Sequence, residues 1–192
     1  MQWAVKVNSV GDEVISLAEA KLHLRVDHNT EDDLISDLIT AAREHVEKYL
    51  NLAVVEKSLT LYLDAFPSGN VIELPYSNLI GIDSVKYRDG SGALQTWDPS
   101  NYTEDTASNP GRLIKAYNVS WPNTLGHPQA VEITYTAGYG GSPPEVPHPI
   151  IAAMKLVIGD LYEHREAVKD TQSYVNPTVD RLLNFYRVGL GI

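Results

Sequence analysis

The chain has 192 residues, of which 43% are hydrophobic, enough to bury one core with a smaller satellite. Its 15 Lys and Arg stand against 25 Asp and Glu, a formal net charge of -10, so it offers no phosphate-neutralising patch for tight wrapping of nucleic acid. It has no cysteine, which excludes disulfides, thiolate nucleophiles and cysteine zinc sites.

The acidic residues are concentrated in the first two thirds of the chain. Residues 1–50 and residues 51–146 each carry 5 basic and 10 acidic side chains, whereas residues 147–192 carry 5 of each. This distribution suits a soluble protein, or a surface past which a polyanion can slide without binding. No run of eighteen apolar residues occurs, so we expect no membrane span, and the opening MQWAVKVNSVGDEV lacks the basic start and apolar run of a signal peptide.

The stretch SLAEAKLHLRVDHNTEDDLISDLI, from residue 16, contains two helix starts. Ser16 and Glu19 form a capping box, which predicts a short helix over residues 17–25 that ends near Val26. The chain then reaches four polar residues, which we interpret as a hinge: Asp27, His28, Asn29 and Thr30.

A long helix is predicted over residues 31–50. Asn29 or Thr30 is expected to cap it, and its first turn is acidic, as the helix dipole favours. Its apolar residues recur at helical spacing along one stripe: Leu34, Ile35, Leu38, Ile39, Ala42, Val46, Tyr49 and Leu50.

Residues 55–137 change to the pattern of a small antiparallel β module. In VVEKSLTLYLDAF, leucines at 59, 61 and 63 alternate with Thr, Tyr and Asp, which is typical of a half-buried strand. The sequence Asp89-Gly90-Ser91-Gly92 predicts a tight turn. Further strands are predicted over residues 71–74, 79–87, 112–117 and 131–136. The aromatic residues of this region are expected mainly in its core: Tyr87, Trp97, Tyr102, Tyr117, Trp121 and Tyr135.

Helical patterns return after GYGGSPPEVPHP, residues 138–149, which is mostly Gly and Pro and marks a linker. A second long helix is predicted over residues 148–168. Gly159 within it suggests that another backbone approaches closely. Asn176 and Pro177 form the cap and first position of a short last helix, which precedes the segment RVGLGI.

Together these elements predict an α+β fold. Neither long helix can bury its stripe alone, so the two are expected to pack together with the short terminal helices as one helical body, residues 1–54 and 150–192. A small antiparallel β module, residues 55–137, is inserted into this body, and residues 138–149 form the Gly/Pro linker.

No constellation of residues for catalysis, metal binding or a cofactor stands out. His45 and His164 lie beside glutamates on the long helices, but a two-metal carboxylate site needs Glu-x-x-His on one helical face, and Glu44 and Glu47 do not share the face of His45. GYGGSPP lacks the Lys-Ser/Thr of a phosphate loop, and no serine lies in a nucleophile elbow. We therefore expect no catalytic residue, no metal and no cofactor.

The order of the segments is more informative than any single residue. They occur along the chain as ISLAEAKLHLRVD, EDDLISDLITAAREHVEKYL, IELPYSNLIGIDSVKYRDGSG, AVEITYTAGYG, VPHPIIAAMKLVIGDLYEHRE and VDRLLNFYRV. In this order and spacing, from about residue 15 to residue 188, the chain resembles the head–tail connector (adaptor) proteins of tailed bacteriophages and related gene-transfer particles.

The resemblance implies a structural protein rather than an enzyme, assembled in the host cytoplasm and located in the virion at the head–tail interface. About twelve copies would form a ring beneath the phage portal protein, extend the DNA channel and dock the tail-proximal neck or tail-completion protein. Genomic DNA would pass through the lumen without sequence-specific binding, and no membrane would be involved.

Carried onto the C-terminal segment LLNFYRVGLGI, the resemblance suggests a set of portal-docking candidates that order on assembly: Phe185, Tyr186, Arg187, Leu190 and Ile192. An ordinary frayed terminus accounts for the same segment.

Two further classes of function are open at this point. One is a head- or tail-completion protein, a binding module of the virion that acts through its β surface without a twelve-fold ring. The other is a hydrolase, whose activity would depend on four residues of the long helices: Glu44, His45, Glu163 and His164.

Overall fold

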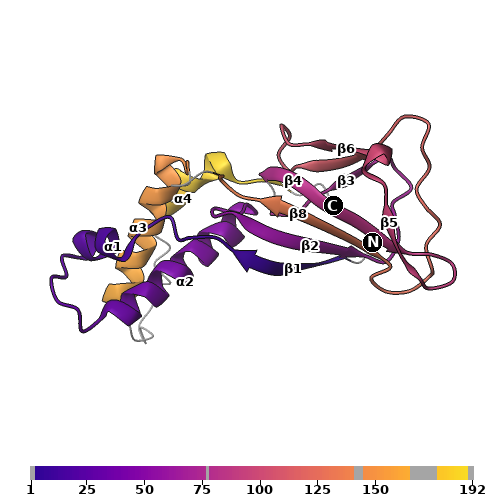
Figure 1. The fold of residues 1–192 in the computed structure, drawn as a ribbon. Helices are drawn as coiled ribbons and strands as arrows, with labels where there is room; N and C mark the ends of the chain where they lie inside the picture. Colours follow the sequence, from indigo (N-terminus) through magenta and orange to yellow (C-terminus); the bar gives the residue numbers. More distant parts are fainter. Residues whose placement is uncertain (1–2, 77, 141–144, 165–176, 190–192) are drawn as a thin grey trace, which may run out of the picture. The chain divides into compact units, whose positions relative to one another are not determined.

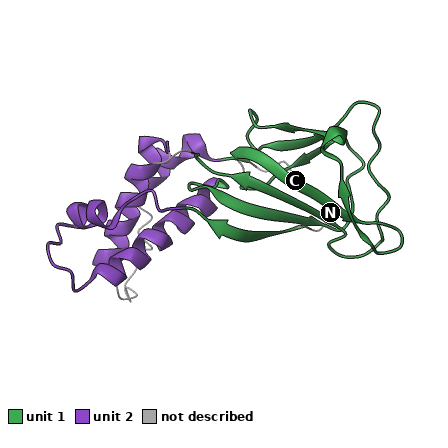
Figure 2. Cartoon of the chain, in the orientation of Figure 1, with its two compact units in different colours: residues 1–11, 51–140, 188–192 green, residues 12–50, 141–187 purple. Residues whose placement is uncertain are grey.

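The computed structural model describes residues 3–76, 78–140, 145–164 and 177–189 (Figure 1). The chain divides into two compact units, each made of segments that are distant in the sequence (Figure 2). The β unit comprises residues 1–11, 51–140 and 188–192, and the helical unit comprises residues 12–50 and 141–187. No helix in the described part of the chain is long and apolar enough to cross a lipid bilayer.

The β unit contains two antiparallel sheets. The larger sheet has the order β1 (Trp3–Val10), β2 (Lys57–Leu63), β8 (Val131–Ala137), β4 (Leu79–Arg88) and β5 (Leu94–Trp97). The smaller sheet has the order β3 (Val71–Glu73), β7 (Arg112–Lys115) and β6 (Tyr102–Asp105), and a 3-10 turn, η1 (Pro99–Asn101), precedes β6. The predicted tight turn joins β4 to β5, where the Gly92 amide donates to the Asp89 carbonyl over 2.9 Å.

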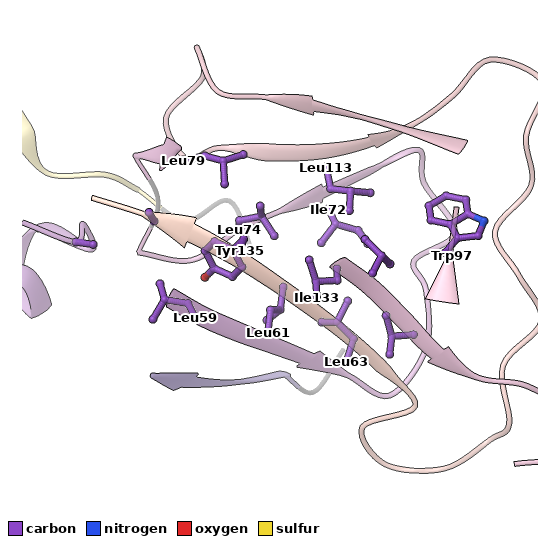
Figure 3. Packing of buried hydrophobic residues seen from close by; sticks show 14 residues of the cluster. Leu59, Leu61, Leu63, Ile72, Leu74, Leu79, Trp97, Leu113, Ile133 and Tyr135 are labelled. Atoms are coloured by element: carbon purple, nitrogen blue, oxygen red, sulfur yellow. The ribbon is translucent and has the colours of Figure 1, made fainter. Parts of the chain in front are cut away.

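The core of the β unit follows from the pairing of its central strands β2 and β8. Leu59 and Leu61 lie opposite Tyr135 and Ile133, and all four side chains are buried. On β8, the residues that alternate with Tyr135 and Ile133 are only half-buried. This two-residue period matches the prediction from the alternating leucines of β2. Figure 3 shows these side chains directed at residues of the smaller sheet, among them Ile72. Each such aliphatic side chain contributes about 1.5–3 kcal/mol when fully buried.

Close backbone packing fixes the end of β8 in the β unit. The buried Tyr135 hydroxyl donates to the Pro75 carbonyl over 2.5 Å, and burial raises the pKa of Tyr135, so the phenol remains a donor. Gly138 has a φ of 133°, and a Cβ there would lie 2.4 Å from the Val55 carbonyl oxygen. Glycine is therefore required at the first residue of the Gly/Pro segment for both its backbone conformation and its missing side chain.

The aromatic residues of the β unit are mostly core, as expected, with one exception. Trp97 and Tyr135 are buried, and the partly buried Phe66 stacks on Trp121 with ring centroids 4.8 Å apart. Tyr117 is the exception, since 92% of its surface is exposed. It lies in a turn closed by a hydrogen bond from the Val119 amide to the Ala116 carbonyl.

In its described residues the helical unit contains four helices and a 3-10 turn: α1 (Leu17–Leu24), α2 (Asp32–Leu50), α3 (His148–Glu163), α4 (Pro177–Leu183) and η2 (Asn184–Tyr186). The predicted capping box is confirmed, because the Ser16 side chain accepts from the Glu19 amide and Glu19 accepts from the Ser16 amide. α2 contacts both α1 and α3, and α3 contacts α4. The predicted stripe of α2 supplies its fully buried apolar residues: Ile35, Ile39, Ala42, Val46 and Leu50.

The predicted fold class, a helical body of two long packed helices with a small inserted β module, is wrong. α2 and α3 do contact each other, but the described chain has two sheets, of five and three strands, and the β unit is the larger of the two units. Three strands escaped prediction: β1, β5 and β6. β1 is an edge strand with both faces largely exposed, so its sequence shows no regular burial pattern, and β5 and β6 are only four residues long. The end of the predicted helix 148–168 and the expected cap Asn176 lie outside the described residues.

The interpretation of Gly159 is also corrected. A Cβ at this position of α3 would find only the His23 Nε2 atom within 4 Å, at 3.7 Å, which is ordinary van der Waals contact. It faces a side chain of α1 rather than another backbone, so the described packing does not require a glycine here.

Gly159→Ala should therefore stabilise the protein by about 0.5–1 kcal/mol, because alanine has the higher helix propensity and its methyl group fits. Urea unfolding followed by far-UV circular dichroism measures the shift of the midpoint. Gly138→Ala is the matched control with the opposite expected sign. It should destabilise the protein, because its Cβ would collide with the backbone at Val55. Destabilisation by Gly159→Ala would contradict the packing described for α1 and α3.

Candidate assembly surfaces

The predicted docking segment forms a short turn at the end of the helical unit. Phe185 is 94% exposed, Tyr186 is half-buried and Arg187 is exposed. The Arg187 guanidinium lies 5.5 Å from the ring centroid of Tyr49, in a cation–π contact. Leu190 and Ile192, the other two docking candidates, lie outside the described residues.

This turn is held in place although Phe185 is exposed. The Tyr49 hydroxyl donates to Asn184 Oδ1 over 2.9 Å, and Leu183 is completely buried. Desolvation, together with the nearby Asp180 carboxylate, raises the pKa of Tyr49, which keeps its hydroxyl protonated as a donor. Phe185 thus projects from a turn that already makes these contacts in the single chain, whereas the prediction was a segment that orders on assembly. Such a side chain would lose little conformational freedom on binding a partner.

The predicted hinge is connected to its surroundings by polar side chains. Lys21 Nζ donates to Asn29 Oδ1 over 2.7 Å and to Asp32 Oδ1 over 2.6 Å. Thr30 Oγ1 lies 2.8 Å from His28 Nδ1, and Asp27 is exposed. Next to the hinge, the Tyr162 hydroxyl of α3 donates to Glu31 Oε2 over 2.6 Å. Side-chain hydrogen bonds therefore hold the connection between α1 and α2, and Lys21 makes two of them.

A buried ionic network joins the segment before α1 to the middle of α2. Arg43 Nε lies 3.0 Å from both carboxylate oxygens of Glu13, and Arg43 Nη1 lies 2.8 Å from Glu47 Oε2. Thr40 Oγ1 also donates to Glu13. Arg43 and Glu47 are almost completely buried. Burial lowers the pKa of Arg43, but Glu47 and Glu13 together raise it by more, so its pKa lies above its usual range and the guanidinium stays charged.

Arg43→Met should destabilise the protein by about 3–5 kcal/mol, because it breaks the buried ion pair with Glu47 from one side only. The double variant Arg43→Met/Glu47→Leu should recover most of this loss, since the buried charge is then removed as well. Urea unfolding of the two variants checks both values. Equal stabilities of the single and double variants would contradict the assignment of Glu47 as a buried, charged partner.

The helical unit carries most of the acidity of the chain. It has 9 basic and 16 acidic residues, against 6 and 9 in the β unit. Three of the acids lie exposed along α2: Asp33, Asp37 and Glu44. The ionic pairs described above neutralise some of the others, so an acidic strip remains on the solvent side of this helix.

The histidines weighed for a metal site do not come together. His45 is exposed on α2, and His164 Nδ1 lies 3.0 Å from the Asp160 carbonyl of its own helix. Among the residues that the structure describes, no group of three or more His, Asp or Glu side chains could hold a metal ion.

Among the exposed apolar side chains that sequence reasoning missed, the most exposed are Tyr117 in the β unit and Leu22 on α1, which is 81% exposed. Leu22 lies in a predicted helix that also contains Leu17 and Leu24, and composition alone does not distinguish the exposed leucine from the half-buried ones. Large exposed apolar residues of this kind are the ones that protein interfaces cover.

Comparison with known proteins finds a family match over part of the chain. Residues 14–80 match the family described as "Phage gp6-like head-tail connector protein". No curated protein matches the chain.

Three solved structures share the fold over almost the whole chain. A chain of the virion of a native gene transfer agent (GTA) particle has a TM-score of 0.81 at 21% identity, covering 98% of this chain and 97% of that one. A chain of the neck of an empty GTA particle, computed with C6 symmetry, has a TM-score of 0.79 at 22% identity, covering 100% and 98%. A chain of the neck of a native GTA particle, computed with C12 symmetry, has a TM-score of 0.76 at 21% identity, covering 97% and 97%.

The resemblance seen in the sequence is thereby confirmed: residues 14–80 carry the pattern of the phage gp6-like head–tail connector proteins, and the fold of the whole chain is that of GTA virion and neck chains.

Proposed function

We propose that this protein is the head–tail connector, or adaptor, of a tailed phage or a related gene-transfer particle. About twelve copies form a ring beneath the portal protein, extend the DNA channel and dock the next neck or tail protein. The observation that carries the proposal is the match of nearly the whole chain to a GTA neck chain, from a particle neck computed with C12 symmetry, together with the family match over residues 14–80.

The protein works at the head–tail interface of the virion, and it is assembled there from copies made in the host cytoplasm. Its role is mechanical, so it needs neither a catalytic residue nor a cofactor. A ring requires two different surfaces on each copy that fit each other. The rigid helices α2 and α3, with a buried stripe and a solvated face each, are suited to supply such surfaces.

The charge of the helical unit suits a passage for DNA. Its excess of acidic residues, with the exposed strip on α2, repels phosphates rather than binding them. In the proposed ring this strip faces the lumen, and genomic DNA passes it without sequence-specific contacts. The chain forms no membrane contact in this role.

Portal docking is assigned to the C-terminal segment. Phe185 is the anchor, because a fixed and fully exposed aromatic ring can fill a pocket of a partner at low entropic cost. Tyr186 and Arg187 flank it, and Leu190 and Ile192 extend the contact. The tail-proximal protein binds the opposite side of the ring.

Phe185→Ser should weaken binding to the portal protein by about thirtyfold or more, the range of an interface hot spot, and leave the stability of the free protein nearly unchanged. Tyr117→Ser is the matched control, since it removes a similarly exposed aromatic ring from the β unit. Surface plasmon resonance against purified portal rings measures both. Equal affinities of the wild type and Phe185→Ser would remove Phe185 from the docking surface.

A completion protein that acts through its β surface is the second candidate, and one observation favours it. Tyr117 is 92% exposed in a hydrogen-bonded turn of the β unit, a geometry suited to partner binding. This candidate predicts the reverse result, with Tyr117→Ser impaired in binding and Phe185→Ser unaffected.

A further inference from the structure

Helix α1 is attached to the helical unit with little apolar burial. Of its eight residues only Ala20 is completely buried, and Leu22 is 81% exposed. α2, in contrast, buries residues along its whole length. Because apolar burial supplies most of the stability of a helix in a folded protein, α1 receives far less of it than α2 does.

The intrinsic stability of α1 is also low. Isolated helices shorter than about 12–15 residues are marginal in water, and α1 has eight residues. At its start, the capping box with Ser16 satisfies backbone amides of the helix. At its end, the Arg25 and Val26 amides donate hydrogen bonds to carbonyls of the last turn. Arg25 takes the left-handed conformation, with φ 59°, which costs a non-glycine residue some free energy. These hydrogen bonds cap the two ends of the helix but do not connect it to the other helices.

Ala20 and the half-buried Leu17 and Leu24 supply the apolar contacts of α1, and its polar attachment rests largely on one side chain. Lys21 bridges Asn29 and Asp32 at 2.7 Å and 2.6 Å, and only 14% of its side chain is exposed. The other ionic tie, from Lys155 of α3 to Glu19, is longer, at 3.7 Å, and Glu19 is half-exposed, so it contributes little. On either side of α1 the chain is well anchored, by the buried Ile15 before it and by α2 after it.

We propose that α1 opens and closes as a unit on the helical unit, with the two contacts of Lys21 as its latch. In the closed state Lys21 holds the hinge residue Asn29 and the first residue of α2. In the open state residues 17–26 leave their contacts while Ile15 and α2 stay in place. Elements of low local stability are the ones from which proteins draw moving and binding parts, and this one carries the exposed Leu22. The proposal concerns the free protein and does not rest on the connector role.

Amide hydrogen exchange followed by mass spectrometry tests the proposal on the full chain. In the wild type, the hydrogen-bonded amides of α1 should exchange at least tenfold faster than those of the buried middle of α2. Lys21→Met keeps the length and the helix propensity of the side chain but removes both contacts, and it should accelerate exchange in α1 by about tenfold or more while leaving α2 unchanged. Lys48→Met, at an exposed lysine in the last turn of α2, is the matched control and should leave exchange in α1 unchanged.

Three results would overturn the proposal. Exchange of α1 and α2 at one common rate in the wild type would show that α1 unfolds only with the rest of the unit. Acceleration of both helices by Lys21→Met would show that Lys21 stabilises the whole unit rather than a local latch. An unchanged rate in α1 after Lys21→Met would show that the two contacts do not hold it.

Discussion

The pairing of β2 with β8 is the constraint on which the rest of the structure depends. Lys57 at the start of β2 lies opposite Ala137 at the end of β8, so the two ends of the segment 57–137 lie side by side. The next residue, Gly138, approaches the Val55 carbonyl so closely that only a glycine fits. The chain therefore comes back, at Gly138, beside Val55, although about eighty residues separate the two in the sequence. Within the helical unit, α2 and α3 contact each other.

Both units combine a tightly fixed interior with exposed groups on fixed backbones, and this combination suits an assembly component. In the helical unit, Arg43 of α2 binds Glu13 of the segment before α1, and Tyr49 of α2 binds Asn184 of the C-terminal turn. Phe185 then projects from this turn. In the proposed ring such pre-organised surfaces would lose little entropy, and α1, with its weaker attachment, is the part that we propose can adjust.

Much of the local structure could be predicted from the sequence, because periodicity and capping are properties of neighbouring residues. The capping box of α1, the stripe of α2 and the buried leucines of β2 all appear in the structure, although Thr60 between two of these leucines is buried as well. Edge strands were harder to predict. β1 was missed because an exposed strand has no buried face to impose a pattern, and the helical body was overestimated as a result. The contacts of the surface could not be predicted either. The Lys21 bridge and the exposure of Leu22 and Phe185 depend on how segments far apart in the chain pack, and composition does not encode this.

The most direct test of the connector role is the mass of the purified protein in solution, measured by light scattering alone and after mixing with the portal protein, with electron microscopy of any large species. We expect a ring of about twelve copies coaxial with the portal, as the C12 symmetry of a similar GTA neck suggests. A protein that stays monomeric in the presence of the portal would contradict the connector role.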